Sequence, residues 1–149
     1  MSILLLRGPD CVAGHRGRPA RIAPRVMRQL LAQAGRAGKT LAVRGCASEG
    51  ELLHALAQAD AAAVEMLLLD PGACSDSAAT AVAVAQLGRP YVEVHDDACD
   101  QREPCLCAAS RQRVGQVGGY CAQSYALALS IALEHLGCNG YESDVHVGT

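Results

Sequence analysis

Residues 66–74, MLLLDPGAC, decide the fold expected for this chain. Four apolar residues follow one another without interruption and then meet an Asp-Pro-Gly sequence, which stops regular structure. A short continuous apolar run is typical of a strand that is covered on both faces, as in a parallel sheet. The first such run, Ile3–Leu6, ends in a similar way at a Gly-Pro-Asp sequence, residues 8–10.

Strand and helix patterns alternate along the rest of the chain. Further strands are predicted at Thr40–Val43, Tyr91–Val94 and Val114–Tyr120. Helices are predicted from Pro24 to the glycines at 35 and 38, from a capping box at Ser48, over 77–87 with Ser75 or Asp76 as cap, and over 121–136. Residues 11–23 are predicted to be a loop.

This alternation predicts one α/β domain, residues 1–149, with a polar C-terminal tail at 137–149. Its sheet is expected to have five parallel strands with helices on both faces. Ligands of such folds bind beyond the carboxyl ends of the strands. The polar residues that follow Leu6, Leu69 and Val94 are therefore the first candidates for function.

Composition excludes several classes of function. The net charge is −2, the pI is about 6.2 and aromatic residues make up 3% of the chain, so we expect no nucleic-acid partner. No apolar segment is long enough for a membrane span or a signal peptide, so a cytoplasmic protein without a membrane partner is expected. The eight cysteines include no C-x-x-C and are expected to be mostly buried, apolar side chains.

The strand ends carry motifs that resemble those of the type II dehydroquinases. The matching segments, given as the family pattern and then this chain, are N-G-P-N at Arg7–Asp10, H-E-G-E-L at Ser48–Leu52, N-P-G-A-x-T-H-T-S at Asp70–Ala78, and E-V-H-x-S-N-x-x-x-R-E at Glu93–Glu103. These motifs agree in order and spacing, and the resemblance covers nearly all of residues 3–137.

The resemblance implies a flavodoxin-like fold with three layers, αβα. It also implies the reaction of that family, the dehydration of 3-dehydroquinate to 3-dehydroshikimate through an enolate, in the shikimate and quinate pathways. A lid tyrosine removes a proton beside the ketone, and a neighbouring arginine favours its phenolate form. A histidine at a strand end protonates the leaving hydroxyl. No cofactor or metal is implied, and the expected partners are a small-molecule ligand and copies of the same chain, as a trimer or dodecamer.

The site residues implied by the resemblance follow from the matched positions. His95 matches the general-acid histidine, Glu93 the glutamate paired with it, and Arg16 the lid arginine, with Arg18 as an equal candidate. The positions that match substrate-binding residues, or lie directly among them, are Asp10, Asp70, Asp76, Asp96, Asp97 and Arg102.

The chain departs from the family at the base and in its charge. No tyrosine precedes Tyr91, and the position nearest to the lid tyrosine is Ile22 or a neighbour. Loss of a general base costs typically about 10²–10⁴-fold in rate. The substituted aspartates add negative charge, and two unit charges about 4 Å apart interact by about 4 kcal/mol at an effective dielectric near 20. The sequence therefore predicts a homologue with little or no dehydratase activity, whose ligand is 3-dehydroquinate or a less anionic molecule.

Several alternatives remain open. A working dehydratase would use a replacement base, for which the candidates are His15 and, from a neighbouring subunit, Tyr120, Tyr125 or Tyr141. Other sites to weigh against inert interpretations are a metal site of His95 with Cys99, Cys105 and Cys107, thiol nucleophiles at Cys11 and Cys74, a cation site at Asp96, Asp97 and Asp100, and an anion-binding loop with Arg16, Arg18 and Arg21.

Overall fold

The computed structural model describes residues 2–12, 15–96 and 110–138. Its elements in chain order are β1 (Ser2–Arg7), β2 (Asp10–Val12), β3 (His15–Gly17), α1 (Pro24–Arg36), β4 (Thr40–Gly45), α2 (Glu49–Ala61), β5 (Val64–Asp70), the 3₁₀ turn η1 (Gly72–Cys74), α3 (Ala78–Ala85), β6 (Tyr91–Val94), β7 (Arg113–Val117) and α4 (Gln123–His135).

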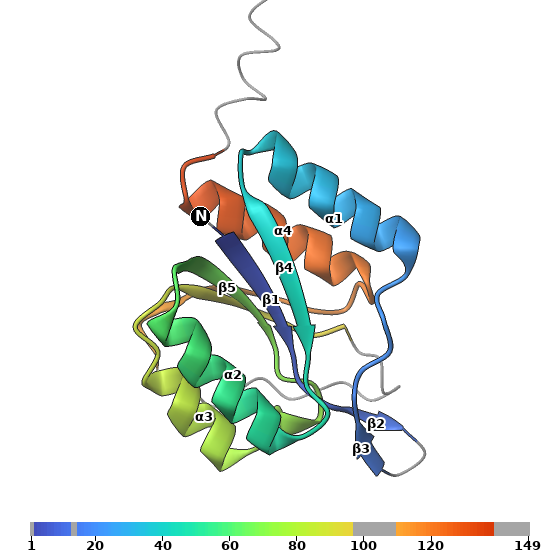
Figure 1. Ribbon diagram of the computed structural model, residues 1–149, viewed down its shortest axis with the longest axis vertical. Coiled ribbons are helices and arrows are strands. Elements are labelled where there is room, and N and C mark those ends of the chain that lie inside the picture. The colour runs from blue at the N-terminus through green and yellow to red at the C-terminus, as the bar shows by residue number, and fades with distance from the viewer. Residues whose placement is uncertain (1, 13–14, 97–109, 139–149) are drawn as a thin grey trace, which may run out of the picture.

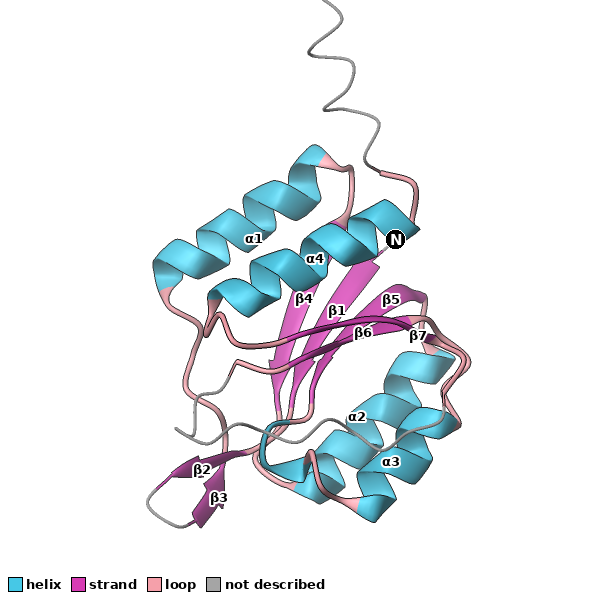
Figure 2. Ribbon diagram, turned by 180° about the vertical axis from the view of Figure 1, so that it is seen from behind, coloured by secondary structure: helices cyan, strands magenta, loops and turns pink. Residues whose placement is uncertain are grey.

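Five strands of the described residues form one parallel sheet in the order β4-β1-β5-β6-β7. Counted by their own order along the chain, this is 2-1-3-4-5, the flavodoxin-like arrangement. Helices α1 and α4 cover one face of the sheet, and α2 and α3 cover the other (Figures 1 and 2). The predicted α/β fold with three layers is confirmed.

Apolar side chains from the strands enter both layers between sheet and helices. In β1, Ile3 and Leu5 pack toward α1 and α4, whereas Leu6 packs toward α2 and α3. In β5, Leu68 belongs to the first layer and Leu69 to the second, and both are fully buried. The uninterrupted apolar runs therefore arise because each central strand is covered on both faces.

Two helix starts show how local signals performed. Ser48 caps α2 as predicted, since its hydroxyl accepts from the Glu51 N–H at 3.2 Å and the Glu51 carboxylate accepts from the Ala47 N–H at 2.9 Å. The predicted cap of α3 was wrong. Its cap is Ser77, which accepts from the Thr80 N–H, because η1 takes up the preceding residues and engages Ser75.

The predicted loop over 11–23 was also wrong in its first part. Strands β2 and β3 pair antiparallel as a short hairpin, with Asp10 opposite Gly17 and Cys11 opposite Arg16. Each strand has three residues, which is too short to show a periodic pattern in the sequence. In Figure 1 the hairpin lies at the end of the sheet where β1 and β4 finish.

Among the described residues, the search for a membrane-crossing helix found none of sufficient length and hydropathy.

Candidate functional site

The turns that follow β1 and β5 hold each other in place. The Gly8 N–H donates to the Asp70 carbonyl at 2.7 Å, and the Ala73 N–H donates to the Pro9 carbonyl at 2.7 Å. A Cβ atom on Gly8 would lie 2.2 Å from the Pro71 carbonyl oxygen, so the backbones can approach this closely only with glycine there. The two strand ends are therefore fixed relative to each other before any side chain contributes.

Glu93 and His95 form a pair on one face of β6 and its extension. The His95 Nε2 atom lies 2.7 Å from Glu93 Oε2, and both side chains are buried. The His95 N–H also donates to the Val117 carbonyl of β7 at 2.9 Å, which fixes the backbone. A carboxylate on Nε2 sets the tautomer of the ring, so Nδ1 is the nitrogen that can exchange a proton with a ligand.

Four buried polar side chains form a second group beside this pair, which we call the Arg7 cluster: Arg7, Asp70, Asp96 and Tyr125. They come from the ends of β1 and β5, from the residue after His95, and from the first turn of α4. The Arg7 guanidinium donates to the Tyr125 oxygen at 3.0 Å and lies 3.4 Å from Asp96 Oδ2. The Tyr125 oxygen lies 2.5 Å from Asp70 Oδ2 and 2.7 Å from Asp96 Oδ2. Each of the four residues is at most 7% exposed.

Burial and charge act together on the Arg7 cluster. Burial raises the pKa of the Tyr125 hydroxyl far above its ordinary value, and the charges of Asp70 and Asp96 raise it further while Arg7 opposes them. Burial alone lowers the pKa of the Arg7 guanidinium, but Tyr125, Asp70 and Asp96 outweigh it and leave this pKa raised. Arg7 therefore stays a cation and Tyr125 a neutral phenol at physiological pH.

The Arg7 cluster was not foreseen from the sequence, although Asp70, Asp96 and Tyr125 were each candidates. The missed residue is Arg7, which stands where the family pattern has the first asparagine of N-G-P-N. A cation at the end of an otherwise apolar strand was the available signal. The charge estimate made from the sequence counted Asp70 and Asp96 without this cation, so it overstated the repulsion of an anionic ligand.

The other predicted residues lie in different settings. Asp10 is buried at the start of β2, whereas Asp76 is exposed before the cap of α3. Arg16 is exposed on β3, and Arg18 donates to the Gly45 carbonyl and lies 3.4 Å from Glu51. Asp97 and Arg102 lie outside the described residues, as does the side chain of His15.

The cysteines divide into buried and exposed thiols. Cys74 is buried; burial raises the pKa of its thiol and Glu49 adds to this, while Arg16 acts in the opposite direction, so a reactive thiolate is disfavoured. Cys11 is exposed, which contradicts the interpretation of a buried thiol there. Cys99, Cys105, Cys107 and Asp100 lie outside the described residues, within which no cluster of three or more metal-ligating side chains occurs.

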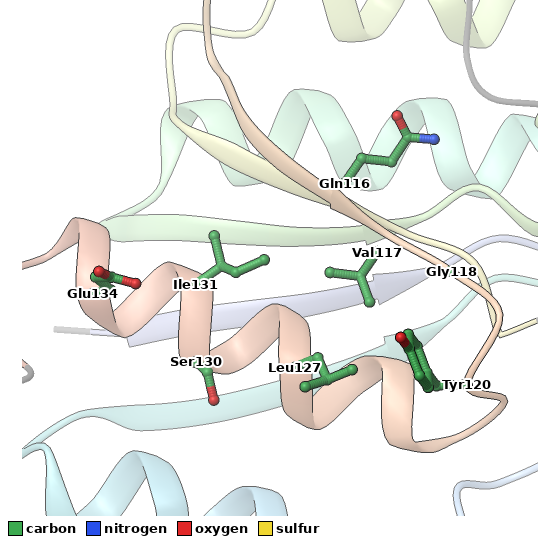
Figure 3. Close-up of a pocket in the computed structure, with 8 residues that line it drawn as sticks. All are labelled: Gln116, Val117, Gly118, Tyr120, Leu127, Ser130, Ile131 and Glu134. Carbon is green, nitrogen blue, oxygen red and sulfur yellow. The ribbon is translucent and has the colours of Figure 1, made fainter.

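A hollow of about 410 Å³ lies on the outer side of β7, away from these groups. Figure 3 shows Leu127 and Ile131 of α4 lining it together with Val117 of β7, while Gln116 points away to the other side of the strand. Tyr120 lies at one end of the hollow and is 62% exposed. The candidate residues at the strand ends do not line this hollow.

The chain is similar to one family of enzymes over most of its length. The family model described as dehydroquinase class II matches residues 1–133. A 3-dehydroquinate dehydratase of Shewanella oneidensis is 30% identical over 141 residues, covering 90% of this chain and 94% of that protein. One from Acinetobacter baumannii is 30% identical over 114 residues, covering 74% of this chain and 76% of that protein.

Solved structures carry the same fold at lower identity. The type II dehydroquinase of Propionibacterium acnes has a TM-score of 0.65 at 24% identity, covering 87% of this chain and 93% of that one. The type II dehydroquinase of Butyrivibrio crossotus has a TM-score of 0.68 at 16% identity, covering 88% and 96%.

Proposed function

Because this chain belongs to the class II dehydroquinase family, we propose that it keeps the small-molecule site of that family but has lost most or all of the dehydration of 3-dehydroquinate. The observation that carries the proposal is the state of Tyr125. A replacement base has to reach its phenolate form near the operating pH. The Tyr125 hydroxyl instead lies between two carboxyl groups and a guanidinium, and burial raises its pKa.

The remaining tyrosines support the same conclusion. Burial raises the pKa of Tyr91, whose side chain is enclosed in the layer beneath α2 and α3. Tyr120 borders the outer hollow, away from His95, and Tyr141 lies outside the described residues. Ile22, nearest to the lid position, packs against the core and has no group that could take up a proton.

His95 is the residue through which the site would act on a ligand. With Glu93 on Nε2, the ring is held with Nδ1 available as acid or hydrogen-bond donor. We propose that Asp10, Asp70, Asp76, Asp96, Asp97 and Arg102 surround the ligand, with Arg16 rather than Arg18 near it, since Arg18 is engaged by Gly45 and Glu51. The ligand is then 3-dehydroquinate or a molecule that carries less negative charge.

The test is turnover of 3-dehydroquinate by the purified protein, followed by the absorbance of the enone product. The Shewanella oneidensis relative serves as the active control, and His95→Ala as the background. We expect a rate lower than that of the relative by at least about 10²–10⁴-fold, the typical worth of a general base. Turnover comparable to the relative, abolished in His95→Ala, would refute the proposal.

The second candidate is an active dehydratase with a replacement base, and the intact Glu93–His95 pair favours it. If turnover is observed, the variants His15→Ala, Tyr120→Phe and Tyr141→Phe locate the base, because only one of them should reduce kcat strongly. Calorimetric titration with 3-dehydroquinate separates the two candidates further. Binding without turnover identifies a site that has kept its ligand, whereas neither binding nor turnover identifies a change of ligand.

We also propose that the chain forms a homo-oligomer, a trimer or a dodecamer. Family membership is the support for this proposal. Light scattering of the protein after size-exclusion chromatography measures the mass directly. A monomer at micromolar concentration would contradict it.

A further inference from the structure

The Tyr125 hydroxyl has more hydrogen-bond partners than one proton can serve. Its oxygen lies 2.5 Å from Asp70 Oδ2 and 2.7 Å from Asp96 Oδ2, and it accepts from the Arg7 Nε–H at 3.0 Å. A phenol carries one O–H, which donates to one acceptor. Two ionised carboxylates at these distances would leave one oxygen–oxygen contact with no proton between the atoms.

The lengths of the two contacts exclude a simple sharing of the phenolic proton. Distances of about 2.5–2.7 Å are those of strong O–H···O⁻ hydrogen bonds, in which the proton lies between donor and acceptor. A single proton split between two acceptors would make both contacts longer. Each of the two contacts therefore contains a proton of its own, and the three oxygens hold two protons in total.

We propose that Asp70 and Asp96 hold one shared proton at neutral pH, with the Tyr125 hydroxyl as the bridge between them. One carboxyl group donates to the phenolic oxygen while the phenol donates to the other. The Arg7 cluster then has one positive and one negative charge and is neutral as a whole. This inference concerns the charge of the site and is independent of whether the protein turns over 3-dehydroquinate.

The surroundings of the bridge agree with this charge count. The titratable groups that act on Tyr125 are Arg7 from β1, Asp70 from β5 and Asp96 from the segment after β6. One guanidinium compensates one carboxylate, and all four side chains are buried. A second ionised carboxylate in this setting would be a buried charge without a compensating cation among these groups, which is unfavourable. Burial also keeps the proton on Tyr125 rather than leaving a phenolate between two carboxylic acids.

The consequence for function is a different ligand class from the one that the aspartate count suggested. A neutral cluster beside His95 offers a hydrogen-bond donor and opposes an anionic ligand much less than two carboxylates would. Binding of a carboxylate or phosphate at this end of the sheet is then compatible with the sequence Asp70-Pro71-Gly72 and Asp96-Asp97.

The shared proton is observable directly in the wild-type protein. Aspartate carboxyl groups labelled with ¹³C are followed by NMR through a pH titration at neutral and alkaline pH. We expect one aspartate resonance at the position of a protonated carboxyl group at pH 7, which returns to the carboxylate position on unfolding. It should disappear in Asp70→Asn and persist in the control Asp76→Asn, whose aspartate is exposed. A spectrum in which all aspartates are ionised at pH 7 overturns the proposal.

Stability against pH gives a second test with a defined sign. The native pair keeps a proton that an unfolded aspartate, with a pKa of about 3.9, has lost. Unfolding therefore releases a proton, and stability falls as pH rises from above 3.9 to the raised pKa of the pair. One proton corresponds to about a tenfold rise in the unfolding equilibrium constant per pH unit.

The matched variants isolate this proton from other titrating groups. Asn at position 70 keeps an acceptor for the Gly72 N–H and supplies a permanent donor to the Tyr125 oxygen. We expect the pH dependence of the unfolding constant to be weaker in Asp70→Asn than in wild type by about tenfold per pH unit, and unchanged in Asp76→Asn. Equal pH slopes in wild type and Asp70→Asn overturn the proposal. If Asp70→Asn does not fold, the wild-type NMR titration decides alone.

Discussion

The Glu93–His95 pair and the Arg7 cluster lie at the carboxyl ends of neighbouring strands, but they are assembled in different ways. Glu93 and His95 are two residues apart, so one extended strand brings them together. Arg7 and Tyr125 are 118 residues apart, and Tyr125 and Asp70 are 55 apart. The pair therefore needs β6 alone, whereas the cluster needs β1, β5, β6 and α4 in their final places.

This difference teaches how the two groups depend on the fold. The pair is a local feature that a diverging sequence can keep with two residues, and its geometry suits an acid. The cluster ties three strands and a helix together, so losing one member exposes the others to uncompensated burial. We expect substitutions in the cluster to act mainly on stability and substitutions in the pair to act mainly on function.

The largest effect is expected for Arg7→Met, which breaks the cluster. Removing one partner of a buried ion pair leaves an uncompensated charge and typically costs about 3–5 kcal/mol. Urea denaturation of wild type and variant measures the change in the free energy of unfolding. Arg18→Met is the matched control, because Arg18 and Glu51 form an exposed pair worth about 0–1 kcal/mol. Equal effects of the two substitutions would contradict the role given to Arg7.

A smaller effect is expected for His95→Ala, which breaks the pair. The Glu93 carboxylate loses its imidazole partner in a buried position, at a cost of about 1–3 kcal/mol. His54→Ala, at an exposed position of α2, should stay within about 0.5 kcal/mol. A cost for His95→Ala as large as that of Arg7→Met would remove the distinction drawn between the two groups.

The smallest effect concerns the turn that leads from β5 into α3. Ser77→Ala should cost about 1 kcal/mol, the usual loss of a helix cap, because the Ser77 hydroxyl accepts from the Thr80 N–H. Asp76→Ala should change the stability by less than about 0.5 kcal/mol, since Asp76 is exposed. Thermal denaturation compares the two variants, and a greater loss in Asp76→Ala would restore the cap that the sequence alone suggested.

Local signals were sufficient for the frame of the molecule and for part of the site. The apolar runs that contain Leu5 and Leu68 indicated buried parallel strands, and alternation along β6 placed Glu93 and His95 on one face. Ser48 and Glu51 indicated the start of α2. Each of these signals operates over four residues or fewer, within reach of a single turn or strand. The family motifs added the chemistry expected at those positions.

Only the tertiary structure decided the surroundings of the site. The hairpin opposing Cys11 and Arg16 is too short for a periodic pattern, and η1 moved the cap of α3 to Ser77. The meeting of Arg7 with Tyr125 depends on the strand order of the sheet and on the packing of α4 across it. The sequence determined how many carboxyl groups stand at this end. Their charge depends on distances between residues far apart in the chain, because only packing sets which groups share a proton.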